Sequence, residues 1–212
     1  MWAYIKDNKI EQIYQRPKSL VLGEVRYPSN MFTKYTDAEK AAIGIYPVED
    51  SGTKGNDRFE NTSQATYTWS ASDKKVTTSY TITAKSLVDV EDKDDSGNNI
   101  LDEKGNKTYT YGLKTQAKNL AKKQANDYIK QFNWLVERSI YDSSKAIPDV
   151  VKTYVAAIKT DCANIEKAID NASDMAAFKK LYEWEYNTDG SVKTIAPIQN
   201  WSDDYDVKQY VR

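Results

Sequence analysis

The sequence predicts an α+β protein whose strands come mainly first and whose long helices come last. Three observations support this prediction. Apolar and polar residues alternate in several short runs before residue 112, as they do in half-buried strands. One short segment of that region carries the start and stop signals of a helix. After Gly112 the apolar residues recur at every third or fourth position, which is the helical period.

The first predicted domain, residues 1–50, is a small mixed β unit with one short helix, in the order β-β-β-β-α-β. The helix is predicted from Thr36 and Glu39, which have the spacing of a capping box, and from Gly44, which stands just beyond its end. The strands of this unit are expected at Trp2–Lys6, Lys9–Tyr14, Ser19–Leu22, Glu24–Tyr27 and Ile45–Val48.

The second predicted region, residues 51–112, consists of β-hairpins that follow a polar loop. Thr66–Ser70 and Val76–Thr83 alternate well and predict a hairpin with one aromatic face. The segment 86–112 predicts a more exposed and acidic hairpin, which turns at Lys104-Gly105-Asn106.

The third predicted region, residues 113–183, is an antiparallel helical hairpin followed by a short third helix. The first helix is expected from Leu113 to about Arg138, and Pro148 is well placed to start the second. Residues 184–212 are aromatic and acidic, and they are predicted to form an extended C-terminal arm. The first helix is expected to bury the face formed by Ala117, Leu120, Gln124, Tyr128, Phe132 and Leu135.

The second helix of the hairpin has the most regular periodicity in the sequence, a 4-3-4-3-4 repeat of mostly aliphatic residues. Such a seam is buried either by the preceding helix or by a sister subunit in a coiled coil, and the sequence leaves both alternatives open. The second alternative would make the protein an oligomer. The interface candidates are therefore Val151, Val155, Ile158, Cys162, Ile165 and Ile169, together with Trp201 in the arm.

The composition argues against several classes of partner. The 30 basic and 31 acidic residues nearly cancel, and no basic block stands apart from acidic neighbours, so no nucleic-acid partner is expected. No apolar run approaches the roughly 20 residues that span a bilayer, and the first residues do not resemble a secretory signal, so no membrane partner is expected. A single cysteine, Cys162, cannot form an internal disulfide, which fits synthesis in a reducing cytoplasm.

The sequence contains no motif typical of catalysis or of cofactor binding. Histidine, a common general base and metal ligand, is absent. Cys162 lies on the apolar seam, where a buried small hydrophobe is expected rather than a nucleophile. No phosphate-binding glycine loop, nucleophile elbow or dinucleotide fingerprint is present. We therefore expect a protein that is not an enzyme, without catalytic residues and without a cofactor.

One acidic segment matches the spacing of a calcium-binding loop, D-x-[DNS]-x-[DNS]-G-x5-E. Asn99 occupies the position where an apolar residue normally packs, and neither flank has helical periodicity. A solvated hairpin tip explains the same residues, and it is the favoured interpretation, so no metal is expected. The candidate oxygen donors are Asp92, Asp94, Ser96, Asn98 and Glu103.

The 16 tyrosines and 5 tryptophans suggest a second kind of site. Some of them alternate along the predicted hairpins and would form a platform that stacks on sugar rings. Cross-strand packing within the hairpins explains the same residues without a ligand, and it is the favoured interpretation. The residues concerned are Tyr67, Trp69, Tyr80, Tyr109 and Tyr111.

Two groups of short motifs flank the central hairpins. The N-terminal group is Met1–Ile5, Arg16-Pro17, Tyr27–Phe32, Thr36–Glu39 and Ala42–Tyr46. The C-terminal group is Gly112–Ala117, Asn133–Arg138, Ala146–Pro148 and Tyr154–Ile158. Together these motifs resemble small tail-associated proteins of bacteriophages, notably marine ones. The two helices, followed by an acidic tail with Pro197 and Asn200-Trp201, are similar in layout to phage tail-fibre assembly proteins.

The resemblance implies a component of a phage tail, baseplate or tail fibre, or a chaperone for one, and it carries over no functional residue. The main hypothesis is a structural virion protein, made in the host bacterial cytoplasm, which contacts other phage tail proteins and copies of itself. A second hypothesis is a tail-fibre assembly chaperone that is absent from the finished particle. A third is a receptor-binding module that recognises glycans through its exposed aromatic residues.

Overall fold

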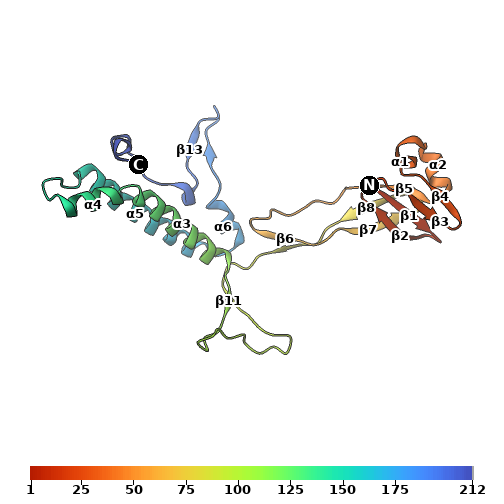
Figure 1. Cartoon of the computed structure of the whole chain (residues 1–212), viewed down its shortest axis with the longest axis horizontal. Helices are drawn as coiled ribbons and strands as arrows, with labels where there is room; N and C mark the ends of the chain where they lie inside the picture. Colours follow the sequence, from red (N-terminus) through yellow and green to blue (C-terminus); the bar gives the residue numbers. More distant parts are fainter. Residues whose placement is uncertain (212) are drawn as a thin grey trace. The chain divides into compact units, whose positions relative to one another are not determined.

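The computed structural model describes residues 1–211 and contains two compact units, Met1–Ala84 and the chain from Lys85 onward. Helices account for 35% and strands for 24% of the residues, which confirms the predicted α+β class. Strands dominate the first unit and long helices the second (Figure 1). Arg212, the last residue of the predicted C-terminal arm, lies outside the described residues.

The first unit is built on a five-stranded sheet with the strand order β2-β1-β5-β8-β7. The β5–β8 pair is parallel, and the other neighbouring pairs are antiparallel. In chain order, the elements of this unit are β1 (Trp2–Lys6), β2 (Lys9–Tyr14), β3 (Leu20–Leu22), β4 (Val25–Tyr27), α1 (Met31–Lys34), α2 (Asp37–Ala42), β5 (Ile45–Glu49), β6 (Glu60–Thr62), β7 (Thr66–Ser70), β8 (Lys75–Ser79) and β9 (Ile82–Ala84).

Strand β1 shows how the alternating sequence serves the two faces of this sheet. Trp2 points to the face that α1 covers, where its ring lies 4.7 Å from that of Phe32. Ala3 and Ile5 point to the opposite face and form a buried cluster with Val76 of β8. Because successive side chains of a strand alternate between faces, the pattern Trp-Ala-Tyr-Ile builds two cores at once.

The second of these clusters lies inside a curled sheet. It draws its residues from all five strands and from neither helix of this unit. The edge strands β2 and β7 approach each other, and the indole Nε1 of Trp69 in β7 donates a hydrogen bond to Oδ1 of Asn8, in the β1–β2 turn, at 2.8 Å. The sheet is therefore a partly closed barrel whose interior is filled by side chains.

The structure corrects the strand predicted at Val76–Thr83. That segment divides into β8 in the five-stranded sheet and β9, which pairs with β6. The chain leaves the sheet at Tyr80, and the short, polar β6 has no sequence pattern that would have predicted it. The boundary between the two units consequently falls after Ala84, inside the region predicted as 51–112, because β8 pairs with β5 of the first predicted domain.

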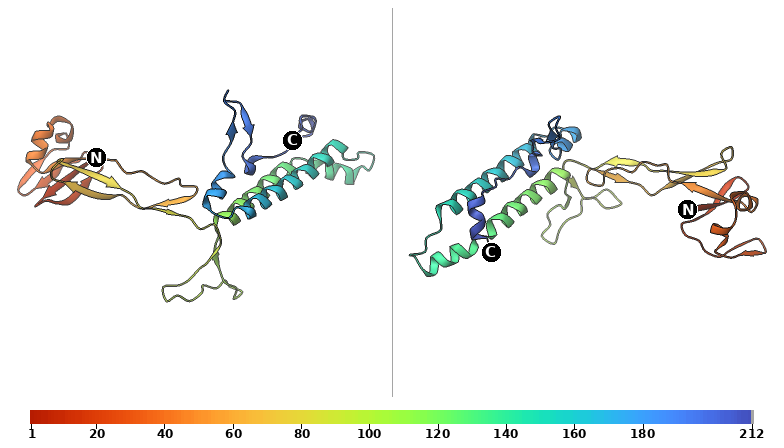
Figure 2. Two further views of the ribbon diagram at one scale, coloured as in Figure 1. Left: turned by 180° about the vertical axis from the view of Figure 1, so that it is seen from behind. Right: turned by 90° about the horizontal axis from the view of Figure 1, so that it is seen from above.

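The second unit is organised around two long helices, α3 and α5, which lie side by side (Figure 2). Their register is antiparallel: Lys118 pairs with Asp170 at 2.8 Å, and one turn further along α3, Lys122 pairs with Glu166 at 3.0 Å. In chain order, the elements are β10 (Val90–Glu91), β11 (Tyr109–Thr110), α3 (Leu113–Lys130), α4 (Asn133–Tyr141), α5 (Asp149–Asn171), α6 (Met175–Lys180), β12 (Glu185–Tyr186), β13 (Val192–Thr194), and the 3-10 helices η1 (Pro197–Gln199) and η2 (Tyr205–Tyr210).

The face predicted for the first helix is confirmed only in part: Ala117 is buried as expected, but Leu120 is half exposed. The buried alanines of α3 are Ala117, Ala121 and Ala125, spaced by four residues. Small residues at this spacing let the two helices approach closely, so that the large aliphatic side chains of α5 fill the contact. The prediction was wrong at Leu120 and missed Ala121 and Ala125, because it weighted a large apolar residue above alanine.

The prediction of a single helix from Leu113 to about Arg138 is also wrong in one respect. Helix α3 ends at Lys130, and α4 starts afresh at Asn133, because Phe132 leaves the helical conformation with φ −107° and ψ 2°. Phe132 is nevertheless buried, and it forms a cluster with Leu135, Val151 and Val207. The break therefore directs α4 so that one of its sides packs against this cluster.

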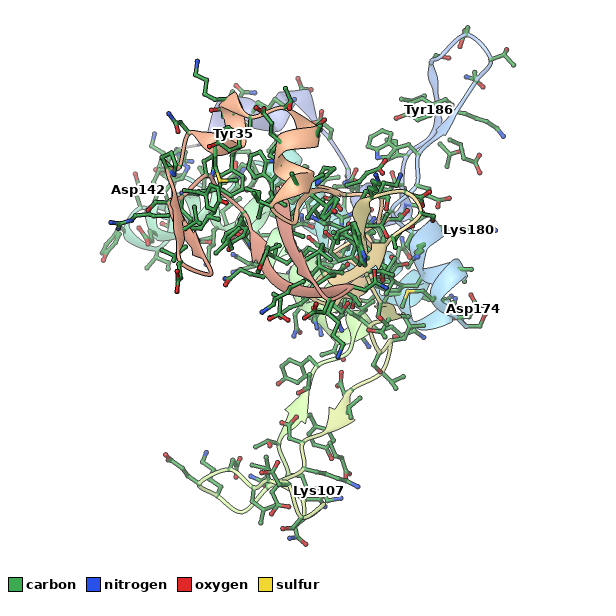
Figure 3. The ribbon with its side chains drawn as sticks, turned by 90° about the vertical axis from the view of Figure 1, so that its right-hand side faces the viewer. Tyr35, Lys107, Asp142, Asp174, Lys180 and Tyr186 are labelled. Atoms are coloured by element: carbon green, nitrogen blue, oxygen red, sulfur yellow. The ribbon has the colours of Figure 1, made fainter. Side chains whose placement is uncertain are left out.

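The C-terminal segment, which was predicted to be an extended arm, largely folds back on the helices. The backbone N–H of Ser202 donates to Oδ2 of Asp161 on α5 at 2.7 Å, and the indole of Trp134 donates to the carbonyl of Tyr210 at 3.0 Å. Val207 of the arm is 2% exposed. The short hairpin of β12 and β13, which carries Tyr186, extends away from the helices (Figure 3). Burial of these apolar residues favours the folded arm over an extended one.

Candidate functional site

The candidate calcium ligands serve turns in a lobe beyond the β10–β11 stem, where Lys107 also lies (Figure 3). Oδ1 of Asp94 accepts hydrogen bonds from the backbone N–H groups of Ser96 and Asn98, both at 2.9 Å. The bond from Asn98 is the first cause of a pKa of Asp94 below its ordinary value. Asp92 accepts instead from the hydroxyl of Thr110 at 2.6 Å. Within residues 1–211, no three His, Cys, Asp or Glu residues are grouped to hold a metal.

A second turn of the same design follows eight residues later. Oδ1 of Asp102 accepts from the backbone N–H groups of Lys104 and Asn106, at 2.9 Å and 2.8 Å. Gly97 and Gly105 have φ angles of +83° and +81°, so each turn needs its glycine. The repeat Asp-x-x-Gly-Asn is visible in the sequence and accounts for the acidic lobe as two similar turns beyond one stem.

The predicted interface seam is buried within the chain. Val151, Ile158, Ile165 and Ile169 are at most 3% exposed, because α3 and the C-terminal segment cover them. These four residues are therefore covered within the chain, which is the first of the two alternatives that the sequence left open. The two remaining positions of the seam, Val155 and Cys162, are half-buried, and Trp201 packs edge-on against the ring of Tyr128 at 5.5 Å.

Cys162 has the environment of a structural residue. Burial is the main reason that the pKa of its thiol lies above the ordinary value, and the neighbouring carboxylate of Glu166 raises the pKa further. A raised pKa leaves little thiolate at neutral pH, and the thiolate is the nucleophilic form.

The helical unit does expose an apolar surface at another place, on α4. Val136, Ile140 and Tyr141 point away from the core with exposed fractions of 45%, 73% and 91%. Val136 also lines an adjoining hollow of about 150 Å³. We call these three residues and the hollow the α4 patch. The hollow is lined by Ile129, Phe132, Asn133, Val136, Ile147, Val151, Lys152 and Val155.

The structure separates the aromatic residues of the predicted platform. Trp69 packs against Tyr46 at 4.5 Å and closes the barrel, so cross-strand packing explains it. Tyr109 and Tyr111 belong to the second unit, where both are exposed. Tyr67 and Tyr80 line the same hollow of the first unit.

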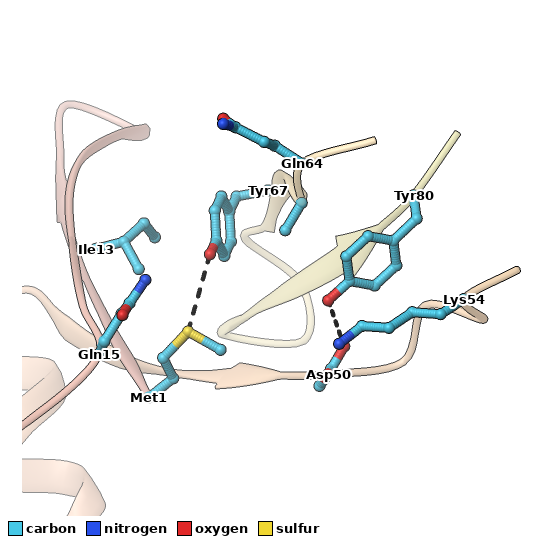
Figure 4. Close-up of a pocket in the computed structure, with 9 residues that line it drawn as sticks. Met1, Ile13, Gln15, Asp50, Lys54, Gln64, Tyr67 and Tyr80 are labelled. Carbon is cyan, nitrogen blue, oxygen red and sulfur yellow. Dashed lines mark hydrogen bonds between the residues drawn. The ribbon is translucent and has the colours of Figure 1, made fainter. Parts of the chain in front are cut away.

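This rim hollow lies at one end of the barrel and has a volume of about 930 Å³ (Figure 4). Strands β2, β5 and β8 run in the same direction, because β1 separates β2 from β5 and the β5–β8 pair is parallel. Their C-terminal ends therefore meet at one rim, together with the starts of β1 and β7. The residues that line the rim hollow are Met1, Ile13, Gln15, Asp50, Lys54, Gln64, Ala65, Tyr67 and Tyr80.

Asp50 and Tyr80 are held in place at this rim. The carboxylate of Asp50 accepts from the hydroxyl of Thr78 at 2.7 Å and from that of Tyr80 at 3.3 Å. The bond from Thr78 is the main reason that the pKa of Asp50 lies below its ordinary value, and the charge of Lys54 adds to this effect. A Cβ atom on Gly52 would lie 2.6 Å from the ring of Tyr80, so only glycine permits this packing.

The rim hollow thus combines one carboxylate, one ammonium group, two amide side chains and two tyrosines. Lys54 Nζ lies 5.2 Å from the centre of the Tyr80 ring, and the hydroxyl of Tyr67 lies 3.9 Å from Sδ of Met1. Such a set can bind a ligand by hydrogen bonds and ring contacts. Sequence reasoning found Tyr67 and Tyr80 but missed Asp50, Lys54, Gln15 and Gln64, because nothing in the sequence relates residues that only strand pairing brings together.

Comparison of the chain with models of protein families, with curated proteins and with solved structures finds no match. Among residues 1–211, no helix combines the length and the apolar composition that a membrane crossing requires.

Proposed function

We propose that this chain is a structural component of a bacteriophage tail, baseplate or tail fibre, which acts through protein–protein contacts. The resemblance of its N-terminal and C-terminal motifs to phage tail-associated proteins supports the assignment to a phage tail. The α4 patch is the observation that supports action through protein–protein contacts. The proposal contains no catalytic step.

The α4 patch has the properties of a docking surface. Single exposed apolar residues are normal on a protein, whereas contiguous ones mark interaction sites. Val136 and Ile140 are four residues apart and therefore neighbours on one side of the helix, and Tyr141 follows directly. Removing such side chains from water contributes roughly 25 cal/mol for each Å² of apolar surface, so a partner that covers them would gain affinity.

In this proposal the two units have different roles. The β-rich unit docks on the tail or baseplate, and the α4 patch contacts another tail protein or a second copy of the chain. The sequence allowed an oligomer contact at the seam of α5, and we propose it on α4 instead, because most of the seam is already buried within the chain.

Mass spectrometry of purified phage particles, with the infected-cell lysate analysed alongside, tests the proposal. We expect the chain in the particles at a fixed ratio to known tail proteins. Presence in the lysate combined with absence from the particles would contradict the virion role and favour the assembly chaperone. Detergent-washed particles are the control for loosely adsorbed protein.

A further inference from the structure

We propose that the rim hollow of the first unit is a binding site for a neutral oligosaccharide. The site lies in the first unit and the α4 patch in the second, so the inference goes beyond the structural role and does not depend on it.

The position and the size of the rim hollow fit a ligand site. The mouth of a β-barrel is a frequent place for binding sites, and pockets for small ligands commonly measure roughly 300–1,000 Å³. The rim hollow, at about 930 Å³, is formed by strand ends and by the segments that follow them (Figure 4). It is open along one side, so a chain of several sugar units could enter without threading.

The lining groups suit a polyhydroxylated ligand. The amides of Gln15 and Gln64 each offer two donors and one acceptor, and both side chains are exposed at the hollow. A sugar hydroxyl also donates and accepts, so it can pair with such amides and with the acceptor oxygens of Asp50. The ring of Tyr67 offers a flat apolar surface for the C–H face of a sugar.

The charges of the rim hollow favour a neutral ligand. The carboxylate of Asp50 and the ammonium group of Lys54 have opposite sign and lie on the same wall of the rim hollow (Figure 4). A phosphate or nucleic-acid ligand would need an excess of positive charge, such as clustered Arg or Lys, which this lining lacks.

The site is also organised before any ligand binds. Hydrogen bonds from Thr78 and Tyr80 orient Asp50, and the close packing of Tyr80 on Gly52 fixes the tyrosine ring. Preorganised groups lose little conformational freedom on binding, which favours affinity.

A binding experiment with the full chain tests the proposal. The probes are immobilised maltohexaose, cellohexaose and chitohexaose as neutral oligosaccharides, and sialyllactose as an acidic one, followed by calorimetric titration of the best neutral probe. We expect binding to at least one neutral probe. The double variant Gln15→Ala/Gln64→Ala should weaken it about tenfold or more, since each lost hydrogen bond contributes about 1 kcal/mol. Tyr67→Ala should weaken it as well.

Two matched variants control for unspecific effects. Gln12→Ala removes an exposed glutamine of β2 outside the rim hollow, and Tyr111→Ala removes an exposed tyrosine of the second unit. Both should keep the affinity of the wild type. Because Gln15 and Gln64 are exposed, their replacement leaves the fold intact even if Tyr67→Ala does not. The proposal is overturned if no neutral probe binds, if sialyllactose alone binds, or if binding survives the double glutamine variant.

Discussion

Helices α4 and α5 carry the same kind of apolar side chain in opposite environments. Ile158 and Ile165 of α5 are buried, whereas Ile140 and Tyr141 of α4 are among the most exposed apolar residues of the second unit. The contrast teaches that periodicity identifies the apolar side of a helix but not whether anything covers it.

The break at Phe132 accounts for the difference. Along α5, the alanine face of α3 and the C-terminal segment cover the apolar residues. Beyond the break, α4 packs Leu135 against the cluster with Val151 and Val207 and leaves its other side without a covering element of this unit. Four variants test this contrast, beginning with the largest expected effect.

Ile158→Ala should cause the greatest loss of stability. The residue is 0% exposed, and a truncated isoleucine in a packed core costs about 2–5 kcal/mol of unfolding free energy. Urea denaturation followed by circular dichroism measures this loss, with Ile140→Ala as the matched control on α4. Equal losses of stability for the two variants would contradict the buried position of Ile158 and the exposed position of Ile140.

Ala121→Leu should have the next largest effect. Ala121 is 1% exposed, so a larger side chain would force α3 away from α5 and cost about 1–3 kcal/mol. Ala156→Leu, on the exposed side of α5, is the control and should leave the denaturation midpoint almost unchanged. If Ala121→Leu were as stable as the wild type, close packing on the alanine face would be refuted.

Ile140→Ser combined with Tyr141→Ser should change stability only slightly, by about 0.5 kcal/mol or less per surface site. The same pair should reduce self-association, or incorporation into phage particles, because it removes the α4 patch. Sedimentation velocity and particle mass spectrometry measure the two effects, and Val21→Ser, an exposed valine of β3, is the control. Unchanged self-association and unchanged incorporation into particles would contradict the docking role proposed for α4.

Asp170→Asn should have the smallest effect, and it should depend on pH. The hydrogen bond from Lys118 is the first cause of a pKa of Asp170 below its ordinary value of 3.8. Because this pKa is lowered in the folded state, the ion pair contributes its full stability at pH values above the ordinary pKa. The contribution is lost as the pH falls through the lowered pKa of the folded state.

Thermal unfolding of the wild type and of Asp170→Asn at pH 7 and pH 3 measures this dependence. The difference in melting temperature should be small at pH 7 and smaller at pH 3, with Asp127→Asn on α3 as the control. A difference that grows towards low pH would contradict the assigned sign.

Local signals in the sequence were sufficient for many elements of the fold. The alternation in Trp2–Lys6 and the capping box of Thr36 and Glu39 both act within a few residues, and both are present in the structure. The pairing of β5 with β8 could not be predicted in this way, because it joins segments separated by a loop, two short strands and a turn.

The rim hollow shows the same limit more strongly. Gln15, Asp50 and Gln64 stand in three separate segments, and none belongs to a motif. They share one site because the co-directional strands β2, β5 and β8 end at the same rim. A sequence pattern records neighbours along the chain, whereas this site depends on the order of strands in a sheet.

The sequence by itself determined the α+β class, most strand positions of the first unit, the two long helices of the second, and the apolar side of α5. These features depend on backbone preference and residue spacing, which act over a few residues. The tertiary structure alone decided that alanines of α3 cover that side, that one side of α4 stays exposed, and that Asp50 and Tyr67 line one hollow at a barrel rim. Those outcomes depend on which distant segments pack together, because burial is a property of neighbours in space.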